Sequence, residues 1–327
     1  MLRPASLFGL LLLACLAGLM GALLIGSVSL PSTDVFAALI GNSNEPQHSI
    51  VWQLRLPRAL SAFTVGGLLA LSGALLQVLL RNPLADPYVL GTSGGAAVGA
   101  LLAMLTGLSG AWLNGSAFVG AVFATFLVFG LARRDGDWSA ARLLLTGIIL
   151  AAGWGALIAF ILTIAPEHNL RGMLFWLMGD LVAGDIPWPH LLLLCAVLAI
   201  SWLLARPLNL LARGEMQART LGVAVAPLRN TLYILAALST ASAVTLAGSV
   251  GFVGLVVPHL LRLAGARDQR VLLPACVLAG GTLLVIADTL ARTLWAPQQL
   301  PVGILTAAIG IPLFLLLLLK QRADTHT

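Results

Sequence analysis

The chain has 327 residues, of which 59% are hydrophobic and 9% are charged, and its formal net charge is +6. Soluble domains carry about 25% charged residues, so this chain has too little charge to cover a soluble surface of its size. The composition excludes a soluble enzyme, a disordered chain and a disulfide-rich secreted scaffold, and it predicts a membrane protein.

Long apolar segments follow one another along the whole chain. A membrane-spanning helix needs about 20 apolar residues, and continuous segments favour helices over the alternating strands of an outer-membrane barrel. We expect an all-α polytopic membrane protein with about ten transmembrane helices in one domain, 1–327. The predicted spans are 7–28, 59–80, 89–108, 113–132, 143–165, 189–206, 228–248, 250–264, 271–291 and 303–319.

The first span imitates a targeting signal. Arg3 precedes an apolar run, as in a secretory signal peptide, and Leu12–Cys15 resembles a lipoprotein cleavage site. The run continues past Cys15 to Ile25 without a polar segment. We therefore interpret it as a membrane span.

Two later segments are unusual. Segment 170–183 is too short to cross the membrane, and we expect a half-helix at one surface. The eighth span is short and contains Pro258 and His259, which predicts a kinked helix shielded by its neighbours.

The basic residues orient the chain. With ten spans both termini lie on one side, and 14 basic residues fall on that side against four on the other. Because cytoplasmic loops are enriched in Lys and Arg, we predict cytoplasmic termini. The basic residues are spread between apolar segments, so no nucleic-acid partner is predicted.

Four arginines fall on the predicted outer side: Arg55, Arg58, Arg171 and Arg292. An arginine on the outer side runs against the rule that basic residues are enriched on the cytoplasmic side. They either contact headgroups or internal carboxylates, or form a docking surface for an acidic partner, since Arg pairs well with carboxylates.

No energy-converting machinery is visible. The chain has no Walker A sequence, and Asp288 is the one acid deep in a span. Asp288 precedes Arg292 by four residues, which predicts a local ion pair on one helix face. The alternative is an ion-coupled secondary carrier that uses Asp288.

The longest inside connection, 207–227, lies between spans six and seven. We predict that Pro207 ends the sixth span and that a short helix occupies 213–221, with Gly222 after its end. Glu215 and Arg219 are four residues apart and can pair on one face. The segment is either an ordinary interfacial helix or a coupling helix for a cytoplasmic motor.

Small residues predict close helix packing. Gly66, Gly67 and Gly73 lie in one span, and Gly94, Gly95 and Gly99 lie in the next. The three cysteines, Cys15, Cys195 and Cys276, all fall inside apolar segments and predict neither a disulfide framework nor a metal site.

Three strings, in order along the chain, carry a resemblance. They are Arg55-Leu56-Pro57-Arg58 with Ser72-Gly73, Gln77 and Arg81–Pro87; then Gly214-Glu215, Ala218 and Leu221-Gly222; then Gly251–His259 with Arg262, Asp288, Arg292 and Leu300–Gly303. Together they resemble the permease subunits of bacterial ABC importers of the FecCD/BtuC type, which import ferric siderophores, haem or cobalamin. The resemblance covers about residues 50–320.

The resemblance implies a type II ABC importer permease in the bacterial inner membrane. This subunit is then a homodimer partner and not an enzyme, and it binds no cofactor itself. Two cytoplasmic ATPase subunits use ATP and Mg, and a periplasmic binding protein delivers the substrate.

The resemblance also assigns residues. Arg55, Arg58 and Arg292 match outer arginines that pair with glutamates of the binding protein. The inside connection matches the coupling loop, with Arg213, Gly214, Glu215, Ala218, Arg219, Leu221 and Gly222 as the expected ATPase contacts. Arg171 receives no role.

By resemblance, spans 59–80 and 143–165 and the half-helix line the path and its gate. The expected path or gate residues are Ser72, Gln77, Thr146, Thr163, Trp176, Gly179 and Asp180. Small, neutral side chains such as Ser72, Gln77, Thr146 and Thr163 predict no metal ligand on the path, which suits a bulky chelate that must pass without being bound tightly.

Two positions depart from the family pattern. Gln299 stands where a Glu usually precedes the Leu-Pro-Val-Gly string, and Asp180 stands where a Ser usually follows the gate glycine. We expect Gln299 to leave Arg292 freer and Asp180 to tune the outer mouth. The spacing Arg262–Gly265 leans toward cobalamin-type members, but haem, ferric siderophore and cobalamin all stay open.

Overall fold

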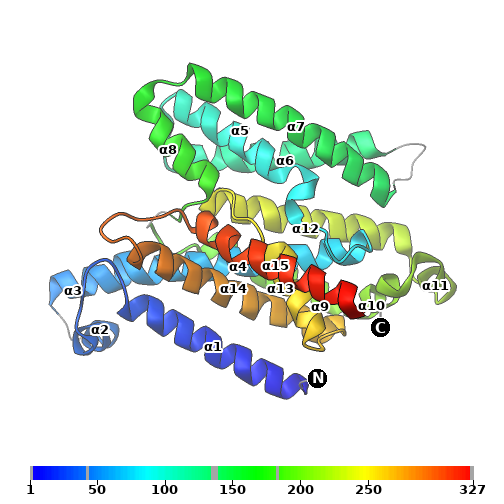
Figure 1. Ribbon diagram of the computed structural model, residues 1–327, viewed down its shortest axis with the longest axis horizontal. Coiled ribbons are helices and arrows are strands. Elements are labelled where there is room, and N and C mark those ends of the chain that lie inside the picture. The colour runs from blue at the N-terminus through cyan, green and yellow to red at the C-terminus, as the bar shows by residue number, and fades with distance from the viewer. Residues whose placement is uncertain (1–2, 42–43, 134–138, 182–183, 325–327) are drawn as a thin grey trace.

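The computed structural model describes residues 3–41, 44–133, 139–181 and 184–324, and these ranges are helical with connecting turns (Figure 1). Arg134 and the last two residues of the predicted half-helix 170–183 lie outside the described residues. The helices are α1 (Pro4–Leu24), α2 (Ser32–Leu39), α3 (Glu45–Ser49), the π-helical turn η1 (Ile50–Arg55), α4 (Leu56–Leu79), the 3₁₀ turn η2 (Pro87–Leu90), α5 (Thr92–Leu105), α6 (Ala111–Ala132), α7 (Ala140–Ile164), α8 (Glu167–Met178), α9 (Trp188–Leu203), α10 (Ala205–Arg213), α11 (Glu215–Thr220), α12 (Val225–Ala247), α13 (Val253–Leu263), α14 (Gln269–Thr293) and α15 (Val302–Asp324).

The all-α prediction is confirmed, and one apolar helix occupies each of the ten predicted spans. Among the described residues, six helices are long and apolar enough to cross a membrane, and α9 with α10 makes a seventh if that pair, bent by 64°, is one span. Three helices, α5, α13 and α15, are shorter where they are described. Ten crossings therefore stay a prediction.

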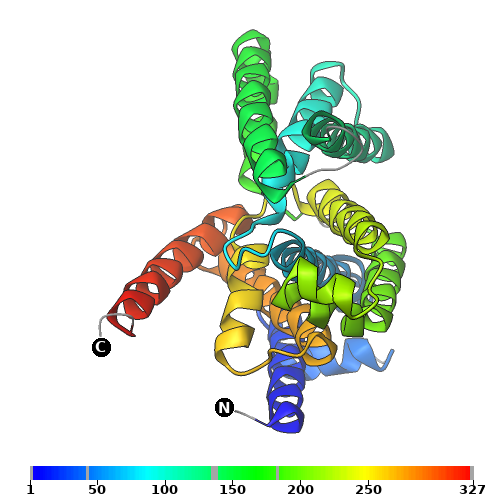
Figure 2. The same ribbon diagram turned by 90° about the vertical axis from the view of Figure 1, so that its right-hand side faces the viewer.

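Helix α4 lies at the centre of the bundle, between α12, α13 and α14 (Figure 2). Glycine makes this possible. A Cβ on Gly66 would lie 2.1 Å from the carbonyl oxygen of Gly280 on α14, and a Cβ on Gly73 would lie 1.9 Å from that of Gly254 on α13. The helix backbones therefore touch directly, as the small residues predict.

Helices α5–α8 form a second group beside this bundle (Figures 1 and 2). Helices α5 and α6 pack closely, since a Cβ on Gly99 would lie 2.3 Å from the Ser116 carbonyl oxygen. Helix α7 packs on α5 and α6 but buries only Leu143, Gly147 and Ile161, so most of its surface faces outward.

The two ends of the molecule differ. The first turn of α1, the last turn of α15, and α10 with α11 lie at one end, while α2 and α3 lie at the opposite end (Figure 1). The start of α1 and the end of α15 thus lie at the same end of the molecule, as an even number of spans would require. Which side of the membrane that is stays a prediction from the basic residues.

Local boundaries correct the sequence reading at the inside connection. The sixth span ends at Leu203, before Pro207, and α10 then begins at Ala205. Pro207 has no N–H to donate to the carbonyl of Leu203 and its ring crowds that carbonyl, so the helix breaks there and bends. The short helix predicted over 213–221 is confirmed as α11, Glu215–Thr220, with Gly222 after its end; Arg213, placed in that helix, is instead the last residue of α10.

Candidate functional site

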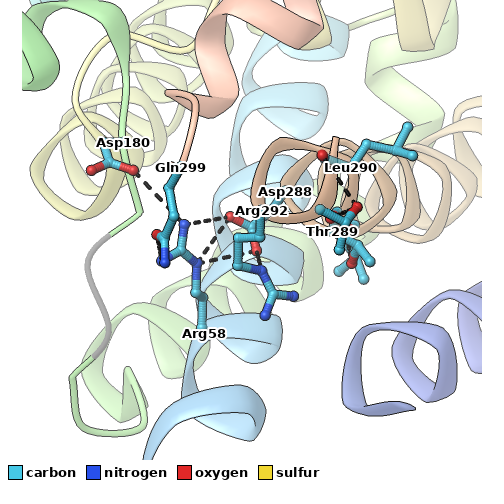
Figure 3. A network of polar contacts seen from close by, with 9 residues as sticks. Arg58, Asp180, Asp288, Thr289, Leu290, Arg292 and Gln299 are labelled. Atoms are coloured by element: carbon cyan, nitrogen blue, oxygen red, sulfur yellow. Dashed lines mark hydrogen bonds and ion pairs between the residues drawn. The ribbon is translucent and has the colours of Figure 1, made fainter. Parts of the chain in front are cut away.

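Two of the three predicted docking arginines, Arg58 and Arg292, meet around one buried carboxylate (Figure 3), and Arg55 lines the same cavity, at the end that holds α2 and α3 and that the basic residues predict to be the outer end. Arg58, at the start of α4, donates from Nε to both oxygens of Asp288 at 3.0 and 3.2 Å. Its Nη2 lies 3.0 Å from Asp288 Oδ1. Asp288 is only 1% exposed, so Arg58 reaches a carboxylate that belongs to α14 and is 230 residues away in sequence.

The same carboxylate holds Arg292. Arg292 Nε lies 3.1 Å from Asp288 Oδ2, which confirms the predicted pair four residues apart. Asp288 therefore bridges two guanidiniums that the sequence alone did not connect. A side chain committed in this way is a structural counter-ion, which gives no support to the carrier that would use Asp288 as its coupling acid.

Arg55 has a different set of partners. Its guanidinium donates to the carbonyl oxygens of Leu23 at 2.5 Å, Leu24 at 3.1 Å and Val28 at 2.5 Å. The last carbonyls of a helix lack intrahelical partners, so Arg55 closes the C-terminal end of α1. It is 4% exposed, and its first role is to hold α1 against the start of α4.

A cavity of about 200 Å³ opens between these side chains. Arg55, Arg58, Arg292 and Gln299 all line it. Arg292 Nη2 is buried and makes no hydrogen bond among the described residues, whereas Arg58 Nη2 is paired with Asp288. Among the described residues, Arg58 and Arg292 pair with Asp288 and Asp180 while Arg55 binds only carbonyl oxygens, so this end holds one positive charge more than its two carboxylates balance.

The two departures from the family pattern both contact Arg58. Gln299 Oε1 accepts a hydrogen bond from Arg58 Nη1 at 3.0 Å, and Asp180 Oδ1 lies 3.8 Å from Arg58 Nη2 (Figure 3). The expectation that Gln299 frees Arg292 has no contact to support it, because the amide binds the other arginine. Burial raises the pKa of the Asp180 carboxyl, and Arg58 opposes that shift.

The predicted coupling residues lie at the opposite end, on α10 and α11. The turn between these helices is at Gly214, with φ 143°, and Gly222 follows α11 with φ 83°. Both are conformations that favour glycine. A Cβ at either position would meet nothing within 4 Å, so backbone conformation alone selects glycine here.

Charged pairs hold this segment to the bundle. Glu215 accepts from Arg219 at 2.7 Å, as the spacing predicts, and lies 3.5 Å from Arg229 on α12. Arg213, Arg219, Leu221 and Gly222 are exposed. Ala218 is fully buried, so its side chain offers no contact to a partner in this structure and serves to seat α11.

Two expected path residues lie inside the subunit. Ser72 is fully buried, donates to the Ala236 carbonyl at 2.9 Å and lies 2.7 Å from Thr240 Oγ1. Gln77 Nε2 donates to the Leu255 carbonyl at 3.2 Å, and its Oε1 accepts from Arg262. In this structure α4 is enclosed and these polar groups bind neighbouring helices, so neither side chain reaches the surface of the single subunit, and their place on the path stays a prediction.

The other path and gate residues remain accessible or adjoin accessible surface. Thr163 is exposed and Thr146 is half-buried, both on α7. Trp176 is half-buried on α8, and Gly179 is buried directly after it with φ 79°. The predicted half-helix is therefore confirmed as a short helix, α8, although no membrane tests its position as a gate.

Sequence reasoning missed two connections. It assigned Asp288 only to its neighbour Arg292, and it left Arg171 unexplained. Arg171 lies 5.6 Å from the centre of the Phe175 ring on the same helix, a local cation–π contact. The spacing of four between these residues was a signal that could have found it.

Comparison with known proteins gives a consistent family match. The model of the FecCD transport family matches residues 10–320. The chain is 44% identical over 278 residues to the vitamin B12 import system permease protein BtuC of Klebsiella pneumoniae, and 43% identical to that of Citrobacter koseri, with 83% of each chain covered.

Solved structures match as well. A metal-chelate type ABC transporter in an inward-facing conformation superposes with a TM-score of 0.83 at 34% identity, covering 97% of this chain and 100% of that one. PsaBC from Streptococcus pneumoniae, in complex with Fab, gives a TM-score of 0.56 at 17% identity and shares the fold alone.

Proposed function

The chain belongs to the FecCD transport family as a multi-pass permease of an ABC importer, and from this premise we propose that it imports cobalamin across the bacterial inner membrane. Such a permease is a transport protein rather than an enzyme. The observation that carries the substrate is the 44% identity, over 83% of both chains, to a vitamin B12 import permease. Haem and ferric siderophores are the competing cargoes.

The substrate is tested by reconstitution. The chain is placed in proteoliposomes with candidate ATPase and binding-protein partners from the same genome, and ATP-dependent uptake of cobalamin, haem and a ferric siderophore is compared. Uptake of cobalamin alone supports the proposal, while uptake of haem or siderophore in its place overturns it. Liposomes without the ATPase control for carrier-type transport driven by an ion gradient.

We propose that two copies of this chain form the path. Helix α7 supports this, because it is 25 residues long and leaves large apolar side chains such as Ile149 and Phe160 at 70% and 62% exposure. A second copy covering α7 and α8 would put Thr146 and Thr163 beside the path.

The dimer is tested by cross-linking. In a chain whose three cysteines are replaced by alanine, Thr163→Cys should give a cross-linked dimer upon oxidation. Ile200→Cys on α9, also exposed, is the matched control. Equal cross-linking at both positions, or none at any exposed position of α7, contradicts this interface.

We propose that the outer cavity receives a carboxylate of a periplasmic binding protein. The excess of one positive charge supports this, as does the buried Nη2 of Arg292, which makes no hydrogen bond among the described residues. Charge-assisted pairs of Arg with carboxylate are strong and geometrically specific. The binding protein is then expected to carry a Glu or Asp at its contact surface.

Docking is tested by binding of the partner to the permease in nanodiscs. Arg58→Gln and Arg292→Gln should each weaken docking about tenfold or more, since hydrogen bonds to charged groups contribute about 1.5–3 kcal/mol. Arg171→Gln, an outer arginine that does not line the cavity, is the control. Retained assembly with the ATPase checks folding, and unchanged docking in both variants contradicts the assignment.

We propose that α10 and α11 transmit the motion of the ATPase. The two helices at the inner end carry exposed Met216 and Leu221, at 75% and 65%, and a glycine turn on either side of α11. The exposed apolar side chains would enter the ATPase, which binds ATP and Mg. Met216→Asp should disrupt assembly or uncouple ATP hydrolysis from uptake, whereas Gln217→Asp on the same helix should do so less.

A further inference from the structure

The guanidinium of Arg58 touches three segments that lead to three helices. It binds Asp288 on α14, Gln299 just before α15, and Asp180 just after α8. The first two contacts are hydrogen bonds. The contact with Asp180, at 3.8 Å, is longer than a hydrogen bond and therefore acts through charge.

Asp180 compensates for the neutral side chain at position 299. Gln299 satisfies one nitrogen of Arg58 but brings no charge, and Arg292 shares the charge of Asp288. Among the described residues Asp180 is the second carboxylate in reach of Arg58. We propose that Asp180 is a positioning residue for Arg58, which ties the end of α8 to α4 and competes with an incoming carboxylate for that guanidinium.

The backbone around Asp180 shows why this tie bears on α8. Gly179 accepts a hydrogen bond from Gly303 N, at the start of α15, at 3.1 Å. A Cβ on Gly303 would lie 2.0 Å from the Met178 carbonyl oxygen, and one on Gly248 would lie 2.2 Å from that of Trp176. The end of α8 is thus packed against α12 and α15, and the contact with Arg58 adds α4.

Because Asp180 is partly exposed, another carboxylate can replace it as the partner of Arg58. The side chain of Asp180 is 27% exposed, against 1% for Asp288. Partly exposed ion pairs contribute little to stability and are screened by salt, whereas buried ion pairs are screened much less. Arg58 lines the outer cavity, and its Nη2 lies 3.0 Å from Asp288 Oδ1 and 3.8 Å from Asp180 Oδ1. An entering carboxylate therefore displaces Asp180 and leaves Asp288 in place, which removes the contact of α4 with the end of α8 and loosens that end against α12 and α15.

This inference rests on the proposed docking of an acidic partner, so its test has one measurement with the partner and one without. With the partner, Asp180→Asn should tighten docking about two- to fivefold, the effect of losing a competing ion pair of about 0.4–1 kcal/mol. Gln299→Glu should weaken docking by a similar factor, and D180N/Q299E should return it to near the wild-type value. Asp185→Asn, an exposed outer acid with no described ion pair, is the matched control.

Without the partner, a spin label at Leu174→Cys on α8 reports the tie directly, in a chain whose native cysteines are replaced by alanine. Asp180→Asn should raise the mobility of the label, and Asp185→Asn should not. Raised mobility with no change in docking supports the tie and contradicts the proposed docking site. Unchanged mobility overturns the tie, whatever happens to docking, and so does an equal effect of Asp185→Asn on affinity.

Discussion

Removing the charge of Asp288 is the sharpest test of the outer arginine cluster. Asp288→Asn keeps the size of the side chain and an oxygen that accepts from Arg58 Nε. It leaves two guanidiniums, each 8% exposed or less, without their shared counter-ion. In the unfolded chain neither guanidinium is buried, so the substitution destabilises the folded state and should lower the free energy of unfolding.

The structure sets the size of the effect. Breaking a buried ion pair by removing one partner costs about 3–5 kcal/mol, because the remaining charge stays buried. Here the Asn oxygen keeps one hydrogen bond and the guanidiniums border a cavity, so the loss should be at the lower end, about 3 kcal/mol. Asp288→Asn combined with Arg292→Gln removes one charge of each sign and should cost less than the sum of the two single variants.

The assay is unfolding in mixed micelles titrated with sodium dodecyl sulfate, followed by far-ultraviolet circular dichroism. Asp185→Asn, on the exposed outer loop, should stay within about 0.5 kcal/mol of the wild type. If Asp288→Asn also stays within about 1 kcal/mol, the bridging role of this carboxylate is refuted. Loss of ion-driven uptake by the isolated subunit would instead revive the carrier alternative.

Three further outcomes are expected. Gly73→Ala should cost about 3 kcal/mol or more in the same assay, because its Cβ would lie 1.9 Å from a carbonyl oxygen of α13, whereas Gly153→Ala, with open space around it, should be near neutral or stabilising. Gly214→Val should leave assembly weak or uncoupled, since φ 143° suits only glycine, and ATP hydrolysis without uptake measures this. Asn209→Ala should lower the free energy of unfolding more at pH 7 than at pH 3. The hydrogen bond from Asn209 lowers the pKa of Asp268 in the folded protein. The stability that this bond adds is therefore present above the pKa of the unfolded chain, about 3.9, and is lost as the pH falls through the folded pKa. Equal destabilisation at both pH values would contradict that reading.

Contacts within one helix could be predicted from spacing. The pairs Glu215–Arg219 and Asp288–Arg292 are four residues apart, and both ion pairs form as expected. Helix geometry places such residues on one face whatever surrounds them. The same spacing of four separates Arg171 and Phe175, but their cation–π contact was recognised only in the structure.

Contacts between helices could not be predicted in this way. Ser72 and Gln77 are polar residues in an apolar span, and sequence reasoning gave them to the path. Both instead bind groups of α12 and α13, because α4 is surrounded on every side. A buried polar group is satisfied either by a neighbour or by a water-filled path, and only the packing decides which.

By itself the sequence determined the membrane class, the apolar segments and the family, because composition, local spacing and short motifs carry this information. Only the tertiary structure decided that Arg58, Asp288, Asp180 and Gln299 meet. These four residues come from α4, α14 and two connections, and their distances depend on how glycine lets the helices approach. Arg58 and Asp288 are 230 residues apart, and a contact between such distant residues produces no periodic pattern in the sequence. The charge balance of the outer cavity is therefore a property of the fold.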